Sequence, residues 1–367
     1  MKELGYRLFA MMYYIYRLIP IKKNRCFLIM THDASVEGNV GVIEQYLKKS
    51  RKSYDFRHLV RSDTRSSKLL SLIFKKSYEL ATSNYIFMDN TFLPLAFIKV
   101  PKSVSVVQLW HGTGTIKKFG QDVNTGKLKV LEGKANENIT HLIVNSPETR
   151  ALYSKTFQVP EEKVYVLGLP RTDILFSKEQ QTEKRKEFYQ EFPELKEKKL
   201  ILYAPTFRDD QTENPKLSID LDRFVKELPK DHVLALRLHP HVARYLSLNY
   251  ESRIIDFSLY ENLNTLLFAS DILITDYSSI VFEYSILQKP MIFYTYDLEV
   301  FSKEGRGFYE PYESYVPGNI AKTTEELITI IKEEDFQTEK IEPFCKQSYS
   351  FFDGKSTYRV IKEVMKV

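Results

Sequence analysis

Short apolar runs alternate with amphipathic, helix-like stretches along most of this chain, and this alternation restricts the fold more than any other feature. In the first half the strand-like runs are Cys26–Met30, Phe56–Val60, Tyr85–Met88, Val104–Leu109, His141–Val144 and Val164–Leu167. In the second half they are Leu200–Tyr203, Val233–Leu238, Ile254–Phe257, Ile272–Thr275 and Met291–Tyr294. A strand, a helical crossover and another strand are typical of parallel sheets covered by helices on both faces. The pattern therefore predicts an α/β fold.

The length of 367 residues exceeds one ordinary domain and fits two. A highly charged segment at 177–199 interrupts the alternation, so we predict the domain junction there. We expect Rossmann-like domains at 23–180 and 181–345, with a ligand cleft between them at the carboxyl ends of their strands. The last segment, 346–367, contains a predicted helix at Ser356–Met365 that could pack back on the N-terminal domain.

The composition is that of a globular protein, with 43% hydrophobic and 28% charged residues. It excludes a disordered, collagen-like or polytopic membrane chain. Two cysteines cannot form a disulfide framework, so we expect a reducing compartment. The net charge of +5 is uneven, because residues 1–100 contain 17 Lys and Arg against 8 Asp and Glu. This excess predicts an anionic partner for the N-terminal part without distinguishing nucleic acid from a membrane.

An apolar, tyrosine-rich stretch at 8–16 lies between Arg7 and Arg17. It is shorter than the roughly 20 apolar residues that cross a bilayer. Two compatible interpretations remain: a first helix packed on its own domain, and an amphipathic segment, 1–22, in contact with a membrane surface. In the second interpretation the tyrosines lie at the headgroup level and the flanking cations meet anionic lipid.

The first unusual polar cluster is Trp110-His111-Gly112-Thr113, directly after the strand predicted at Val104–Leu109. Doubly wound folds bind ligands at such strand ends. His111 is a candidate general base or phosphate hydrogen-bond donor, and Gly112 and Gly114 permit close approach of the backbone to a ligand. The alternative is a histidine that orders a tight turn. We favour a functional role because a tight turn does not need this combination of residues.

Two further clusters follow strands of the second half. Thr206 and Arg208 offer a hydroxyl and a guanidinium on a loop, where ligand contact and a purely structural role are equally good interpretations. Arg237 and His239 lie two residues apart on one side of a strand end and form a candidate phosphate clamp. A structural role and a metal site are the alternatives. No carboxylate or cysteine stands nearby at ligand spacing, so we expect no metal there.

The last cluster runs from Asp276 into a helix predicted at Ile280–Gln288. Ser278 and Ser279 precede this helix, whose first N–H groups and positive dipole end suit a phosphate. Serines at a helix start are often only caps. Glu283 lies one turn further along the same face, where it could accept hydrogen bonds from ribose hydroxyls.

One absent motif and one acidic motif limit the reactions that the chain is expected to catalyse. The sequence has no Gly-x-x-x-x-Gly-Lys-Ser/Thr loop, so ATP hydrolysis of the P-loop kind is not expected. Asp220-Leu221-Asp222 is better interpreted as the acidic first turn of a helix than as a metal site.

Together these motifs resemble the glycerophosphotransferase family that uses CDP-glycerol to build wall teichoic acid. The matching pieces are Trp110-His111-Gly112-Thr113, Asn145-Ser146-Pro147, Gly168-Leu169-Pro170-Arg171-Thr172-Asp173, Tyr203-Ala204-Pro205-Thr206-Phe207-Arg208, Arg237-Leu238-His239-Pro240, and Asp276-Tyr277-Ser278-Ser279 with Glu283. The resemblance implies the GT-B fold, with the nucleotide held mainly by the second domain. It also implies transfer of glycerol phosphate from CDP-glycerol to an acceptor on undecaprenyl diphosphate, with release of CMP.

The resemblance also assigns roles to residues. The family's two essential histidines correspond to His111 and His239, and its donor-phosphate serines to Ser278 and Ser279. The remaining expected CDP-glycerol contacts are Thr206, Arg208, Arg237, Asp276 and Glu283, and the expected acceptor side comprises Trp110, Gly112 and Thr113. No cofactor and no metal are expected. Many members have a proline where this chain has Gly114-Thr115, which puts the shape of the acceptor side in question.

Within the family the chain resembles the short primase, because it starts almost directly with the first predicted domain. We expect it to add one glycerol phosphate to the ManNAc-GlcNAc disaccharide on the lipid carrier, as a peripheral protein at the cytoplasmic face of the cell membrane. A second-step glycerophosphotransferase that extends the primed linkage unit is the alternative, followed by a GT-B glycosyltransferase using a nucleotide sugar. No nucleic-acid partner is expected, and the sequence indicates no oligomeric state.

Overall fold

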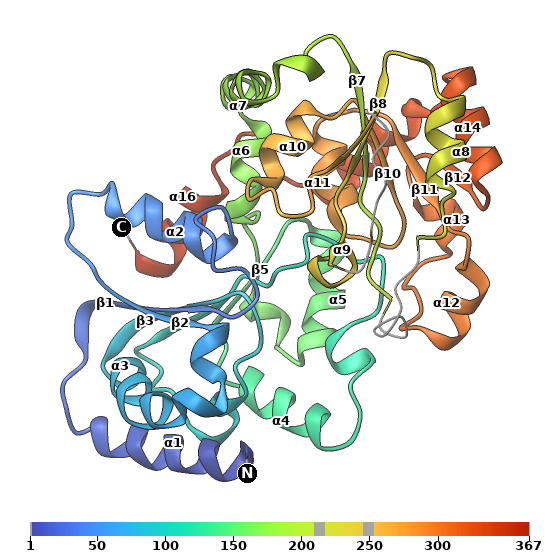
Figure 1. Cartoon of the computed structure of the whole chain (residues 1–367). Coiled ribbons are helices and arrows are strands. Elements are labelled where there is room, and N and C mark those ends of the chain that lie inside the picture. The colour runs from blue at the N-terminus through green and yellow to red at the C-terminus, as the bar shows by residue number, and fades with distance from the viewer. Residues whose placement is uncertain (1, 209–216, 245–252, 367) are drawn as a thin grey trace. The chain divides into compact units, whose positions relative to one another are not determined.

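The computed structural model describes residues 2–208, 217–244 and 253–366, and the chain divides into two compact units (Figure 1). Unit 1 comprises residues 1–113, 119–173 and 348–367, and unit 2 comprises residues 114–118 and 174–347. Each unit contains a parallel six-stranded sheet with helices packed on it. The predicted α/β class with two parallel sheets is confirmed.

The sheet of unit 1 has the strand order β2-β1-β3-β4-β5-β6. Its strands are β1 (Lys22–Met30), β2 (Asp55–Val60), β3 (Ser83–Met88), β4 (Ser105–Gln108), β5 (His141–Val144) and β6 (Val164–Val166). Its longer helices are α1 (Lys2–Tyr16), α2 (Asn39–Lys48), α4 (Gly126–Asn136), α5 (Pro147–Phe157) and α16 (Ser356–Met365).

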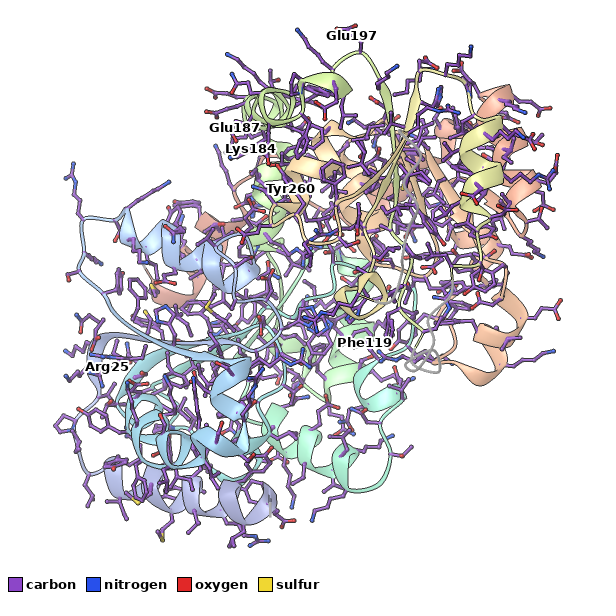
Figure 2. The ribbon with its side chains drawn as sticks, in the orientation of Figure 1. Arg25, Phe119, Lys184, Glu187, Glu197 and Tyr260 are labelled. Atoms are coloured by element: carbon purple, nitrogen blue, oxygen red, sulfur yellow. The ribbon has the colours of Figure 1, made fainter. Side chains whose placement is uncertain are left out.

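Strand β1 explains why unit 1 needs helices on both faces of its sheet. Successive side chains of a strand point to opposite faces, and here both sets are buried. Phe27 and Ile29 belong to the core on the side of α1, whereas Cys26 and Leu28 belong to the core that α2 and α16 cover. Parallel strands covered on both faces have this continuous apolar character. At the start of the strand Arg25, only 2% exposed, pairs with Asp55 (Figure 2).

Helix α16 brings the end of the chain back to unit 1. The carboxylate of Asp173 accepts hydrogen bonds from the backbone nitrogens of Ser356 (2.7 Å) and Thr357 (2.8 Å). These are N–H groups of the first helical turn, which have no partner within the helix. The carboxylate also complements the positive end of the helix dipole, so Asp173 fixes the helix start to the last loop of the sheet.

The domain limits differ from those expected. The chain passes between the units at 173/174 and 347/348 rather than at 180/181 and 345/346. The charged segment interpreted as a junction forms α7 (Lys178–Glu191), a helix of unit 2 with Phe188 fully buried. Lys184 and Glu187 form an ion pair on its outer side (Figure 2). Segment 114–118, expected in the first domain, belongs to unit 2.

The sheet of unit 2 has the order β12-β11-β10-β7-β8-β9. Its strands are β7 (Lys199–Tyr203), β8 (His232–Leu236), β9 (Ile254–Asp256), β10 (Ile272–Thr275), β11 (Met291–Tyr294) and β12 (Asn319–Ala321). Around it lie α7, α8 (Leu221–Glu227), α9 (Pro240–Ala243), α10 (Leu263–Ala269), α11 (Ile280–Ile286), α12 (Leu298–Glu304), α13 (Tyr312–Tyr315), α14 (Thr324–Glu333) and α15 (Ile341–Ser348). Asp220 accepts a hydrogen bond from Arg223 N and caps α8, so the acidic motif there is a helix start, as predicted.

Segment 114–118 is held in unit 2 by backbone hydrogen bonds. The nitrogen of Lys118 donates to the carbonyl of Gly307 (3.1 Å), and the nitrogen of Tyr309 donates to the carbonyl of Ile116 (3.2 Å). Gly114 is packed so tightly that an added Cβ would lie 2.2 Å from the ring of Phe282 in α11. Glycine is therefore required at position 114 by the close approach of an aromatic side chain.

Candidate active site

The loop after β4 carries the predicted acceptor-side residues of unit 1. Trp110 has a left-handed backbone, with φ of 55°, a conformation that is uncommon for a bulky side chain. Its nitrogen donates to the side-chain oxygen of Gln108 (2.9 Å), and its ring packs against Phe157 with centroids 5.0 Å apart. Trp110 thus anchors a strained turn that presents the next residue, His111.

The imidazole of His111 is held at one edge and on its faces. Its Nδ1 lies 3.0 Å from the carbonyl oxygen of Asp89. Because a carbonyl oxygen can only accept, Nδ1 carries the proton in this contact and Nε2 carries the lone pair of the neutral ring. The ring stacks on His32, with centroids 3.7 Å apart, and against Trp110 at 4.0 Å. This is the form of histidine that a general base requires.

Asp89 connects the loops after β1 and β3. Its carboxylate accepts hydrogen bonds from the backbone nitrogens of Thr31 (3.1 Å), His32 (3.2 Å) and Asp33 (2.9 Å). Burial nevertheless raises the pKa of Asp89 to about 6, against the lowering effect of these N–H groups. Neither Asp89 nor His32 was among the predicted site residues. Asp89 directly follows the predicted strand Tyr85–Met88, and His32 is the second residue after Cys26–Met30; this position at a strand end is the signal that could have found them.

Gly112 and Thr113 are fixed through their carbonyl groups. The hydroxyl of Tyr153 donates to the carbonyl of Gly112 (3.2 Å), and the side-chain nitrogen of Asn145 donates to the carbonyl of Thr113 (3.0 Å). Arg171 donates from Nη1 to the carbonyl of His111 (3.1 Å). Asn145 and Arg171 lie in the loops after β5 and β6, so the ends of several strands support the loop that carries His111.

Unit 2 has a pocket at the carboxyl ends of β7, β8 and β10. Its lining includes the predicted residues Thr206, Arg208, His239 and Asp276. The exposed imidazole of His239 stacks on Phe207, with centroids 4.7 Å apart. The full lining is Tyr203, Pro205, Thr206, Phe207, Arg208, Leu217, Ser218, Leu238, His239, Val242, Asp276 and Tyr296. An aromatic platform beside hydroxyl and imidazole groups suits a polar, ring-containing ligand.

Arg208 and Asp276 line this pocket, but their charges are paired within the protein. Nη2 of Arg208 lies 2.9 Å from Asp276 Oδ2, and its Nε lies 2.7 Å from Asp297 Oδ2. The guanidinium also lies over the rings of Tyr277 and Phe301. The pKa of Arg208 is raised by these two carboxylates against the opposing effect of burial. The geometry therefore gives this pair a role in holding the loop after β7.

Arg237 follows β8 and binds the loop after β9. Its Nη1 donates to the carbonyls of Phe257 (2.7 Å) and Ser258 (3.2 Å) and also to that of Tyr260. Burial lowers the pKa of Arg237. Nη1 of Arg237 thus stabilises the loop after β9. The phosphate clamp of Arg237 with His239 stays a prediction.

Ser278, Ser279 and Glu283 lie where β10 turns into α11. The hydroxyl of Ser278 accepts a weak hydrogen bond from the nitrogen of Ile280 (3.3 Å), and Ser279 occupies the N-cap position. Both serines are half-buried, whereas Glu283 in the first turn is only 3% exposed. The predicted order of turn, serines and helix is confirmed, and the roles of these residues toward a donor stay predictions. Among the described residues, no group of three or more His, Cys, Asp or Glu is placed to hold a metal ion.

Comparison with known proteins identifies a matching family and relatives that are named for teichoic acid. The model of the CDP-glycerol:poly(glycerophosphate) glycerophosphotransferase family matches residues 11–366. The chain is 36% identical over 371 residues to a teichoic acid poly(ribitol-phosphate) polymerase of Bacillus spizizenii, covering 99% of this chain but only 60% of the relative. It is 34% identical over 357 residues to the teichoic acid ribitol-phosphate primase of the same organism, covering 94% of this chain and 91% of the relative.

A glycerol-phosphate relative and a solved structure complete the comparison. The teichoic acid glycerol-phosphate primase of Bacillus subtilis is 33% identical over 295 residues, covering 79% of this chain and 75% of the relative. The structure of the wall teichoic acid polymerase TagF superposes with a TM-score of 0.80 at 25% identity, covering 98% of this chain and 93% of that one. The GT-B-like arrangement expected from the sequence is confirmed by this likeness.

Proposed function

This chain belongs to the CDP-glycerol:poly(glycerophosphate) glycerophosphotransferase family, and from that premise we propose that it transfers glycerol phosphate from CDP-glycerol to a lipid-linked acceptor of wall teichoic acid synthesis. The observation that carries the proposal is the oriented imidazole of His111, whose Nδ1 lies 3.0 Å from the carbonyl oxygen of Asp89, so that in the neutral ring Nε2 is the proton acceptor. Transfer of a phosphoryl group to a hydroxyl needs such a base together with groups that neutralise charge on the leaving nucleotide.

The proposed reaction is a displacement at phosphorus. The acceptor hydroxyl oxygen bonds to the phosphorus that bears glycerol, and its proton passes to Nε2 of His111. The bond from that phosphorus to CMP breaks, and CMP leaves with the electron pair. His239, Arg237 and the serines at the start of α11 are the proposed groups that stabilise the negative charge on the leaving nucleotide, and Glu283 is proposed to bind the ribose.

We propose priming as the step: one glycerol phosphate is added to the ManNAc-GlcNAc disaccharide on undecaprenyl diphosphate. Relatives named as primases, at 34% and 33% identity, support this choice, whereas a relative named as a poly(glycerol phosphate) polymerase, at 29% identity over 98% of its own length, supports extension. Extension of the primed linkage unit is the alternative step. A second candidate donor is CDP-ribitol, which is favoured by the 36% and 34% identity to two relatives named for ribitol phosphate, against 33% to the glycerol-phosphate primase.

The test is donor and product analysis with the purified full chain and a synthetic lipid-linked disaccharide. Release of CMP is measured with CDP-glycerol and with CDP-ribitol, release of UDP is measured with UDP-N-acetylglucosamine, and the product mass shows the transferred group and the number of added units. We expect CMP from CDP-glycerol and a single added unit. Release from CDP-ribitol alone would replace the donor, several added units would replace the priming step, and turnover of the UDP-sugar alone would overturn the proposal.

A lipid acceptor implies contact with a membrane, and α1 supports that part of the proposal. Phe9 and Tyr13 are buried in the core of unit 1, so the interpretation as a packed first helix is confirmed. The same helix exposes an apolar stripe, because Leu4, Met11 and Ile15 are 63%, 53% and 49% exposed. Within the described residues no helix is long and apolar enough to cross a bilayer. We propose that the stripe lies in the membrane interface.

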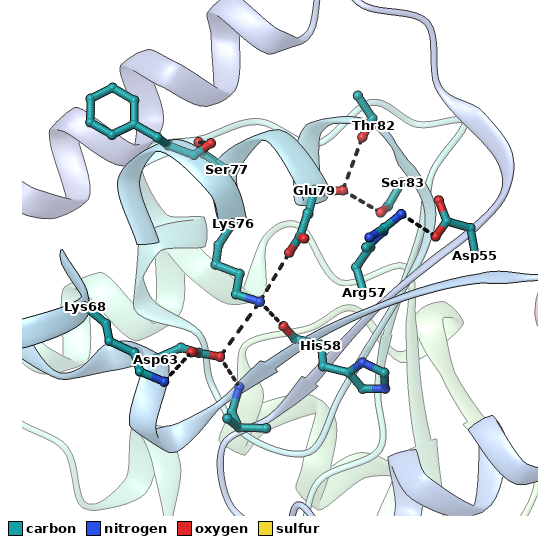
Figure 3. A network of polar contacts seen from close by, with 12 residues as sticks. Asp55, Arg57, His58, Asp63, Lys68, Lys76, Ser77, Glu79, Thr82 and Ser83 are labelled. Atoms are coloured by element: carbon teal, nitrogen blue, oxygen red, sulfur yellow. Dashed lines mark hydrogen bonds and ion pairs between the residues drawn. The ribbon is translucent and has the colours of Figure 1, made fainter. Parts of the chain in front are cut away.

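The neighbouring segment 69–76 extends this apolar surface. Leu70 and Phe74 are 72% and 49% exposed, and the side chain of Leu69 lies 3.1 Å from where a Cβ on Gly5 of α1 would be. The inner side of the segment is tied down by Lys76 (Figure 3). Its ammonium contacts the carboxylate of Glu79 at 3.3 Å and the carbonyl of His58. The segment therefore presents its apolar side chains outward on a fixed base.

Vesicle sedimentation tests the proposed peripheral location at the membrane. We expect the chain to bind vesicles that contain anionic phosphatidylglycerol more strongly than neutral vesicles, because residues 1–100 contain 17 Lys and Arg against 8 Asp and Glu. The double substitution Met11→Glu with Phe74→Glu should lower binding at least about tenfold. Val300→Glu is the matched control, since Val300 is 57% exposed on α12 of unit 2. Equal binding by the double variant and the control would contradict membrane contact through this surface.

A further inference from the structure

A second imidazole, that of His32, lies face to face with His111. The two ring centroids are 3.7 Å apart and the ring planes differ by 11°. On its other side His111 meets Trp110, with centroids 4.0 Å apart. Two rings at such short distances cannot share one face of an imidazole, so His111 lies between them.

One residue holds the imidazole of His111 and the main chain of His32. The side chain of Asp89 accepts the backbone N–H of His32 (3.2 Å), and the main-chain oxygen of Asp89 accepts Nδ1–H of His111 (3.0 Å). Asp89, at the end of β3, therefore binds both the loop after β1 and the loop after β4. Any displacement of the His32 main chain relative to the His111 ring would have to stretch one of these two hydrogen bonds.

We propose that His32 is a positioning residue for the proposed transfer reaction: its ring closes one face of the His111 imidazole, so that Nε2 can point in only one direction. Trp110 blocks tilting toward the other face, and the bond from Nδ1 to Asp89 blocks rotation within the ring plane. A base held this way loses little rotational freedom when it reacts, which is how supporting contacts raise turnover.

The charges around His32 are compatible with this role. Desolvation lowers the pKa of His32; the nearby Asp33 carboxylate opposes this, whereas the guanidinium groups of Arg171 and Arg61 add to it. A neutral His32 ring stacks on His111 without charge repulsion, and a protonated one would oppose the proton transfer to His111. On the side of His111, the facing groups include the Trp110 ring, the Asp89 carbonyl and the Arg171 nitrogen at the carbonyl of His111.

The inference rests on the proposed function for its effect on turnover, so its test has two readouts. Three variants are compared with the full wild-type chain: His32→Leu, which keeps volume but not a flat ring; His32→Phe, which keeps a flat ring; and His141→Leu. His141 is the matched control, because it stacks on Tyr165 in the same unit with centroids 4.8 Å apart, at the start of β5 rather than at a strand end.

The first readout is CMP release at pH 7.5. We expect His32→Leu to lower kcat about 10- to 100-fold with the donor KM unchanged, as for a misplaced catalytic group. His32→Phe should recover most of that loss, and His141→Leu should resemble wild type. Equal kcat for His32→Leu and wild type would overturn the inference, as would equal losses in His32→Leu and His32→Phe.

The second readout does not depend on the reaction. Side-chain NMR of ¹³C-labelled histidine measures the order of the His111 ring. We expect high order in wild type and in His32→Phe, and a clear decrease in His32→Leu. A ring of His111 that is equally ordered in all variants overturns the inference even if the chain transfers no glycerol phosphate. Absence of CMP release by the wild type, with the expected ring order, would instead overturn the proposed function alone.

Discussion

The carbonyl oxygen of Asp89 lies 3.0 Å from Nδ1 of His111. This contact determines which nitrogen of the ring carries the proton, and so leaves Nε2 as the acceptor. A histidine that only ordered a turn would use its ring to bind its own loop. Here the ring is bound by a different strand end, and it is the main chain of the loop that Tyr153 and Asn145 support. The fold therefore orients the imidazole from a second strand end, as the proposed role of a base requires.

Replacing His111 with Ala should remove the base while leaving donor binding intact. General bases contribute about 10²–10⁴-fold, or roughly 3–5 kcal/mol of barrier. We expect kcat for CMP release to decrease by that factor, with the KM for CDP-glycerol within about twofold of wild type. Near-normal turnover in His111→Ala would exclude the base role.

Asp89 should make the stability of unit 1 depend on pH. Its pKa is raised by burial to about 6 from an ordinary 3.8. The folded state thus retains a proton that the unfolded chain has released, so the stabilisation by this group is complete below pH 3.8 and lost as the pH rises through 6. Asn cannot titrate. The unfolding free energy of wild type minus that of Asp89→Asn should therefore decrease between pH 4 and 7, by up to about 3 kcal/mol.

Urea unfolding followed by Trp110 fluorescence measures this difference, because the sequence has one tryptophan and it lies in unit 1. Glu3→Gln is the control, because Glu3 also lies in unit 1. The pKa of its carboxyl is lowered by hydrogen bonds from Lys127 and Arg7, which keep their charge over this pH range, so its replacement should leave a constant difference between pH 5 and 7. A difference for Asp89→Asn that stays constant or grows with pH would contradict the predicted direction.

The sheets were predictable because their signal is local and repeated. The predicted runs His141–Val144, Ile272–Thr275 and Met291–Tyr294 coincide with β5, β10 and β11. Strand β12 was missed, because Asn319–Ala321 contains one large apolar residue, Ile320, and so does not form an apolar run. The rule that polar residues after parallel strands meet at one edge located His111. It applies equally to His32 and Asp89, which lack a neighbouring Trp or Gly to draw attention to them.

The partners of the charged site residues could not be predicted, since they depend on long-range packing. Arg208 was expected to contact the donor, but its guanidinium pairs with Asp297, which is 89 residues further along the chain. Arg237 was expected to bind phosphate, and its Nη1 is bound to carbonyls in the loop after β9, contacts that the sequence did not indicate; its contact with phosphate stays a prediction. Spacing in the sequence indicates which face of a strand a side chain occupies. It does not indicate which distant residue will form an ion pair or a hydrogen bond with that side chain.

Gly114→Ala should destabilise unit 2 by about 1–3 kcal/mol, as overpacking does. The added Cβ would lie 2.2 Å from the ring of Phe282, far inside contact distance. Shortening that ring should relieve the clash, so the double variant Gly114→Ala with Phe282→Leu should unfold at a higher temperature than the sum of the single effects predicts. Thermal unfolding of the four proteins measures the coupling. Additive effects, or a Gly114→Ala variant as stable as wild type, would mean that segment 114–118 does not pack on α11.

Arg208→Met should lower stability and not only donor affinity. The guanidinium is 8% exposed and lies between the carboxylates of Asp276 and Asp297, so its removal leaves two buried or half-buried negative charges without their cation. Losing one partner of such a pair costs about 3–5 kcal/mol. Adding Asp297→Asn removes one of the stranded charges and should recover part of the loss. If Arg208 acted only on the donor, Arg208→Met would unfold like wild type and raise the KM for CDP-glycerol, and Asp297→Asn would recover nothing.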